Sequence, residues 1–106
     1  MSVEQAKIVD VISIDPHTNE VILTISDHLE WDSDSFHLEL LQDKLNAYLS
    51  FIKSGEINQS YPKAIGRRVV ISIIAKYEPD TEGLIFLTEV KRIIEGAEIG
   101  FHFNHK

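Results

Sequence analysis

Imidazole and carboxylate side chains lie close together along one short stretch of the chain. They are Asp27, His28, Glu30, Asp32, Asp34 and His37. Nitrogen and oxygen donors of this kind bind zinc or manganese, but the spacing matches no established ligand motif and the chain has no cysteine. The alternative is that the acids lie at a helix N-terminus, where negative charge is favourable, and that both histidines are on the surface. The candidate ligand-binding residues are Asp27, His28, Glu30, Trp31 and Asp32. The sequence identifies no catalytic residue, no definite metal and no cofactor.

Two further groups of polar side chains could take part in chemistry. Asp10 lies between apolar neighbours in a predicted strand. It either faces solvent, or faces the helices and needs a partner that would make it a candidate acid or base. Lys63, Arg67 and Arg68 form a basic cluster with Tyr61, which could contact an anionic ligand or an acidic partner, or form ion pairs with acids elsewhere. Neither group indicates a reaction, so we expect a protein that is not an enzyme.

The composition is that of a soluble globular protein, and we assign residues 1–106 to a single domain. The net charge of −7 argues against binding to the phosphate backbone of nucleic acids. No apolar run approaches the roughly 18 residues that a membrane span needs, and the N-terminal residues lack the apolar segment of a signal peptide. We therefore expect an acidic cytoplasmic protein that binds neither nucleic acid nor membrane.

The segments that must position these side chains follow from the hydrophobic periodicity. Strands are predicted at residues 8–14, 21–26, 67–77 and 98–104, and helices within residues 31–55 and between Gly83 and Gly96. The turn-forming run Asp15-Pro16-His17-Thr18-Asn19 joins the first two strands into a β-hairpin. Within residues 67–77, both faces are mainly apolar through Val69–Ala75, as is typical of an interior strand. Residues 56–66 have the composition of a turn.

The first helix is apolar on two sides, whereas a surface helix normally has one apolar stripe. One stripe comprises Leu38, Leu41, Leu45, Tyr48, Leu49 and Ile52, and the other comprises Phe36, Leu40, Ala47 and Phe51. We expect one stripe to pack on a sheet and the other to meet another surface, with Phe36, Leu40 and Phe51 as the candidate interface. Asp32 as the N-cap would place Trp31 and Phe36 in a hydrophobic staple, and Gly55 suits a left-handed C-terminal cap.

The order strand–strand–helix–strand–helix–strand predicts an α/β (α+β) domain. We expect a two-layer sandwich in which a four-stranded mixed sheet carries both helices on one face; the strand order stays open. The second face of the sheet would then expose Ile22, Val70 and Ile74 or their alternates. Together with the second stripe of the first helix, this is more apolar surface than a monomer of this length is expected to bury. Because such patches often mark protein interfaces, a homodimer is favoured.

Several short motifs carry a resemblance that covers nearly the whole chain. They are Asp27-His28-Leu29-Glu30-Trp31, the Leu-Gln-x-Lys-Leu-x-x-Tyr-Leu helix, the Ser-Gly-Glu cap, and Tyr61-Pro62 with Gly66-Arg67. With these motifs the chain resembles a family of small bacterial proteins classed as a domain of unknown function, DUF6572. The resemblance implies a small bacterial α/β domain and assigns no activity and no site residues.

Functions from different classes stay open. The first is a non-enzymatic protein-interaction module, possibly homodimeric, which the surplus apolar surface and the lack of a catalytic pairing favour. The alternative is a small-ligand or metal-binding protein, or a minor enzyme, that uses the acidic and histidine-containing loop before the first helix. A weaker hypothesis, based on net charge alone, is that the acidic surface neutralises a basic protein.

Overall fold

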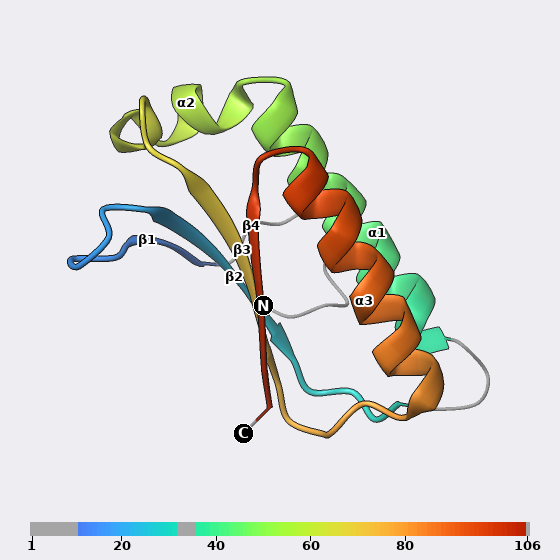
Figure 1. Ribbon diagram of the computed structural model, residues 1–106. Helices are drawn as coiled ribbons and strands as arrows, with labels where there is room; N and C mark the ends of the chain where they lie inside the picture. Colours follow the sequence, from blue (N-terminus) through green and yellow to red (C-terminus); the bar gives the residue numbers. More distant parts are fainter. Residues whose placement is uncertain (1–10, 32–35, 106) are drawn as a thin grey trace.

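The computed structural model describes residues 11–31 and 36–105, and its main elements follow the predicted order (Figure 1). The helices and strands are β1 (Val11–Ile14), β2 (Val21–Asp27), α1 (Phe36–Lys53), α2 (Glu56–Ser60), η1 (Pro62–Ala64), β3 (Val69–Ala75), α3 (Thr81–Gly96) and β4 (Gly100–His105). The short helices α2 and η1 occupy the segment that is predicted as a turn. They form there because Ile57 and Ala64 are buried against the core. The predictions for Asp10, Asp32 and Asp34 lie outside the described residues.

The strands form one mixed sheet in the order β1-β2-β3-β4. β1 is antiparallel to β2, whereas β2, β3 and β4 run parallel to one another. The crossovers through α1 and through α3 therefore advance across the sheet in the same direction. Right-handed crossovers that advance in one direction place their helices on the same face, and Figure 1 shows α1 and α3 together on one face. The predicted four-stranded mixed sheet with helices is confirmed, and β3 is an interior strand as expected.

The core lies between the helices and the sheet. Alternate residues of β2 are completely buried, and the register aligns Leu23 with Ile71 of β3, which in turn aligns with Phe101 of β4. The buried apolar side chains of the two long helices are Leu41, Leu45, Tyr48, Leu87 and Ile94. The first predicted stripe of α1 thus supplies its contacts with the sheet.

The second face of the sheet carries Ile22, Val70 and Ile74, and it is less exposed than the sequence suggests. Ile22 and Ile74 are half-buried, and Val70 is only 2% exposed. Gly100 is the register partner of Val70, and a Cβ atom at Gly100 would lie 2.8 Å from Val70 Cγ2. The valine side chain packs directly over the glycine backbone, so the expected exposure of Val70 is wrong.

Local signals define ends of both long helices. Gly55 has a φ of 83°, so the left-handed residue expected after α1 is confirmed. Asp80 is the N-cap of α3, and its carboxylate accepts a hydrogen bond from the Gly83 N–H at 2.8 Å. Gly55 thus marks the end of α1 and Asp80 the start of α3. The facing sides of these two helices form the candidate site.

Candidate functional site

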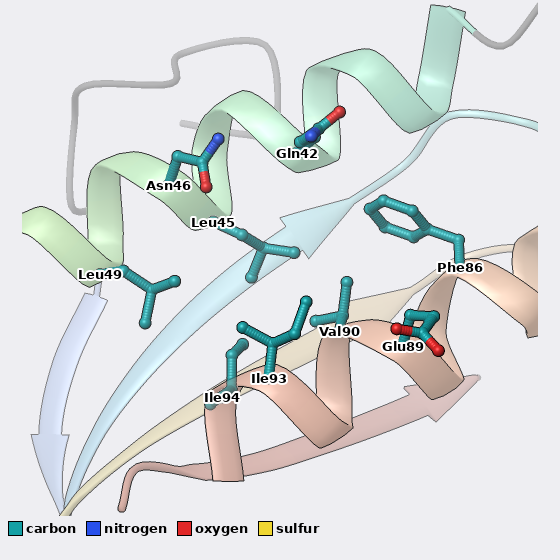
Figure 2. Close-up of a pocket in the computed structure, with 9 residues that line it drawn as sticks. All are labelled: Gln42, Leu45, Asn46, Leu49, Phe86, Glu89, Val90, Ile93 and Ile94. Atoms are coloured by element: carbon teal, nitrogen blue, oxygen red, sulfur yellow. The ribbon is translucent and has the colours of Figure 1, made fainter. Parts of the chain in front are cut away.

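An apolar groove lies between α1 and α3 (Figure 2). Its volume is about 290 Å³, and its lining residues are Gln42, Leu45, Asn46, Leu49, Phe86, Glu89, Val90, Ile93 and Ile94. In Figure 2 the apolar side chains of the two helices point toward one another across this space. Leu45 and Ile94 are buried and form the floor, whereas Ile93 is 55% exposed and lies at the rim.

The groove follows from the spacing of apolar residues on the two helices. Phe86, Val90 and Ile93 lie at i, i+4 and i+7 on α3, and Leu45 and Leu49 lie at i and i+4 on α1. Residues at these spacings share one helical face. Each helix therefore presents apolar side chains to the other as well as to the sheet, and the two sets line a common hollow.

Glu89 supplies this groove with a carboxylate. The carboxylate accepts a hydrogen bond from Arg92 Nη2 at 2.8 Å. This hydrogen bond and the positive charge of the guanidinium lower the pKa of Glu89. The same hydrogen bond and the negative charge of the carboxylate raise the pKa of Arg92. Glu89 is thus ionised at neutral pH, and the α3 side of the rim carries a charge pair.

The lining determines what this surface can do. Six of its side chains are apolar, and the others are two amides and one carboxylate. It contains no nucleophile held against a base, which covalent catalysis requires. A surface of this composition binds by removing apolar area from water, as when an amphipathic helix docks in a hydrophobic groove. The geometry is suited to recognition of a protein segment.

A second polar feature lies at the carboxyl end of β2, where Asp27 is buried. Its carboxylate accepts a hydrogen bond from His37 Nε2 at 2.5 Å and another from the Leu29 N–H at 3.2 Å. His37 lies in the first turn of α1 and is 1% exposed. The expectation that His37 is a surface residue is therefore wrong, because a buried carboxylate needs a hydrogen-bonding partner and His37 provides it.

Trp31 packs beside this pair. Its ring centroid lies 4.1 Å from that of His37, and its indole N–H donates a hydrogen bond to the carbonyl oxygen of Tyr77 at 3.2 Å. It also lies against the backbone of Gly83, where a Cβ atom would be 2.6 Å from Trp31 Cε3. The tryptophan thus joins the loop before α1 to the end of β3 and the start of α3.

The candidate ligand-binding residues have different surroundings. Asp27 and Trp31 pack with His37, whereas His28 and Glu30 are exposed. Asp32 lies outside the described residues. Within residues 11–31 and 36–105, no group of three or more His, Asp or Glu side chains is placed to hold a metal ion. At the two ends of this loop, Asp27 of β2 and His37 of α1 form a buried hydrogen-bonded pair.

The candidate interface residues of α1 also differ from one another. Phe36 is 56% exposed, whereas Leu40 and Phe51 are half-buried and pack against the core. Large exposed apolar side chains on α3 are Leu84, Ile85 and Ile93. The contribution of α3 to an apolar surface is not recognised from the sequence, although the breadth of its apolar stripe was a signal for it.

Two arginines of the basic cluster, Arg67 and Arg68, interact with neighbouring residues. Arg67 donates hydrogen bonds to the carbonyl oxygens of Lys63 at 2.9 Å and Asn19 at 3.0 Å. Arg68 forms an ion pair with Glu20 at 3.4 Å. The ion-pairing alternative therefore accounts for Arg68, and Arg67 connects η1 to the turn of the β1–β2 hairpin.

Comparison with known proteins identifies the family of the chain. The family model of DUF6572, described as a family of unknown function, matches residues 1–106, which confirms the resemblance. No curated protein and no solved structure matches the chain. In the described part of the chain, no helix has the length and apolar character needed to cross a membrane.

Proposed function

We propose that this chain, which belongs to DUF6572, a family of unknown function, binds another protein. In this proposal the protein is a non-enzymatic, cytoplasmic interaction module, and its groove between α1 and α3 accepts an amphipathic helical segment of the partner. The observation that supports the proposal is the groove itself, because six apolar side chains from two helices line a hollow that is open to solvent. Such surfaces often mark protein interaction sites.

The arrangement of the groove favours a helical partner. A third helix laid along α1 and α3 would bury an apolar stripe with the spacing i, i+3 or i+4, and i+7 against Leu49, Val90 and Ile93. A helix satisfies most of its own backbone hydrogen bonds, so it needs few polar partners from an apolar groove. The amides of Gln42 and Asn46 would meet the polar flank of the bound segment.

The charges around the groove favour a segment with basic residues beside its apolar stripe. On α3 the lining carboxylate of Glu89 is ionised and shares its charge with Arg92. On α1, Glu39 precedes Gln42 by three residues, so these two share a helical face. The chain as a whole carries a net charge of −7. Complementary charge accelerates association and makes it sensitive to salt.

Photo-crosslinking in cells that express the protein tests this function. One version carries a photoreactive side chain at Gln42 on the groove rim, and the control carries it at Thr18, which is exposed in the hairpin turn. We expect a protein to be captured from position 42 and not from position 18. A synthetic peptide that spans the crosslinked segment should then bind the purified chain and become helical.

Two matched variants assign the binding to the groove. Ile93 at the groove and Ile65 outside it are 55% and 64% exposed, so glutamate at either position should leave the fold intact. We expect Ile93→Glu to weaken peptide binding by at least about tenfold, or 1.4 kcal/mol, and Ile65→Glu to leave it unchanged. Equal capture from positions 42 and 18, or a peptide affinity that Ile93→Glu does not alter, would contradict the proposal.

A further inference from the structure

The outer edge of β4 is a surface separate from the groove between α1 and α3. β4 is the last strand in the sheet order, so no strand of the described chain pairs with its outer edge (Figure 1). Its six residues, GFHFNH, follow an unbroken register with β3. The backbone N–H and C=O groups on the outer side therefore need water or another strand as partners.

This edge lacks the features that usually keep sheet edges from pairing. Natural edge strands are blunted by lysines and other charges, by proline, or by bulges. β4 contains no Pro, Asp, Glu, Lys or Arg, and its register shows no bulge. In a chain with 17 acidic and 10 basic residues, two copies repel each other least where they meet through an uncharged segment.

A hollow formed by α3 flanks the same edge. Its volume is about 330 Å³, and its lining residues are Leu84, Leu87, Thr88, Lys91, Phe101, His102 and Phe103. The residues from α3 lie at i, i+3, i+4 and i+7, so one face of the helix is turned toward the strand. Leu84 is 56% exposed. An added strand would gain backbone hydrogen bonds from β4 and apolar contacts from α3, which is the geometry of β-strand addition.

We propose that β4 pairs with β4 of a second copy of the chain, antiparallel about a two-fold axis, so that the sheet continues through the dimer. A two-fold interface uses the same patch on both copies, and here each copy supplies both an unpaired strand and a flanking helix face. The two-fold axis sets the Lys91 end of one hollow opposite the Leu84 end of the other, so the two lysines stay apart. This interface does not depend on the proposed binding of a partner helix.

Native mass spectrometry and light scattering of the full chain test the dimer. The His102 side chain is exposed and alternates along β4 with Phe101 and Phe103, which pack in the core, so charged substitutions at His102 spare the core. In the antiparallel dimer, residue 102 of one copy lies beside β4 of the other copy. Like charges introduced at this position in both copies therefore repel each other. We expect the unmodified protein to be dimeric, and His102→Glu and His102→Lys each to raise the dimer Kd by at least about tenfold. An equal mixture of the two variants, one isotopically labelled, should restore a heterodimer.

Two additional variants make the result specific. Asn104→Glu, at the next exposed position of β4, should weaken the dimer in the same way, whereas Ser13→Glu on β1 at the opposite sheet edge should not. Circular dichroism checks that every variant is folded. An unmodified protein that stays monomeric at high concentration would overturn the proposal. A dimer that resists both His102 variants, or that Ser13→Glu or Ile93→Glu weakens equally, would overturn it as well.

Discussion

The carboxylate of Asp27 and the imidazole of His37 form a buried hydrogen bond of 2.5 Å between Nε2 and Oδ2. The two residues are 2% and 1% exposed. Their contact ties the carboxyl end of β2 to the first turn of α1, so it fixes where the helix begins relative to the sheet. Removal of one partner of a buried polar pair is costly because the other is left buried without its hydrogen bond.

Removal of one partner of this pair should therefore be strongly destabilising. We expect Asp27→Ala to lower the free energy of unfolding by about 3 kcal/mol, because it leaves the His37 ring buried without its acceptor. Urea unfolding followed by the fluorescence of Trp31, the single tryptophan, measures the change. Glu30→Ala, at an exposed position of the same loop, is the control and should stay within about 0.5 kcal/mol of the unmodified protein. Equal effects of the two substitutions would show that the pair does not stabilise the fold.

Two glycines of α3 should respond to alanine in opposite directions. A Cβ atom at Gly83 would lie 2.6 Å from Trp31 Cε3 and 3.0 Å from Pro79 Cβ. We expect Gly83→Ala to destabilise the protein by about 1–3 kcal/mol through overpacking. A Cβ atom at Gly96 would meet no atom within 4 Å, so Gly96→Ala should stabilise by up to about 1 kcal/mol through helix propensity. Thermal unfolding measures both, and a stabilising Gly83→Ala would contradict the packing of Trp31 on α3.

The N-cap of α3 should depend on the acceptor at position 80 and not on its charge alone. The Asp80 side chain accepts the Gly83 N–H at 2.8 Å. We expect Asp80→Ala to cost about 1 kcal/mol of unfolding free energy, and Asp80→Asn to preserve most of the stability because asparagine caps helices equally well. Denaturant titrations compare the three proteins. An Asn variant as unstable as the Ala variant would argue against a capping role.

The hairpin turn between β1 and β2 should add a pH-dependent contribution to stability. Asp15 Oδ1 accepts the N–H groups of His17 at 2.7 Å and Thr18 at 3.3 Å, and the hydrogen bond from His17 lowers the pKa of Asp15. A carboxyl whose pKa is lower in the folded protein stabilises the fold above its unfolded pKa, about 4. This contribution is lost as the pH falls through the folded pKa.

We therefore expect the unmodified protein to be more stable than Asp15→Asn at neutral pH, with a difference that shrinks on acidification. Melting temperatures of the two proteins across the acidic range measure it. Curves that stay parallel down to a pH below the folded pKa of Asp15 would show that ionisation of this carboxyl does not contribute.

The sequence by itself determined the four strands and the two long helices of this fold, because their signals are local. Alternating β-branched residues predict β2, the turn after Ile14 predicts the hairpin, and Gly55 predicts the left-handed residue after α1. Each feature depends on the backbone preference or the side-chain period of a few adjacent residues. The family follows from motifs of the same short range.

Only the tertiary structure decided the strand order, the partners of buried polar groups and the candidate site. His37 and Lys44 are polar residues of a helix, yet they are 1% and 0% exposed. Asp27 accepts a hydrogen bond from the first, and the ammonium of the second lies 5.3 Å from the centroid of the Tyr48 ring. The groove exists because α1 and α3 lie side by side on the sheet, where both crossovers place them. Distances between segments far apart in the chain arise from packing of the whole core, and no local pattern specifies them.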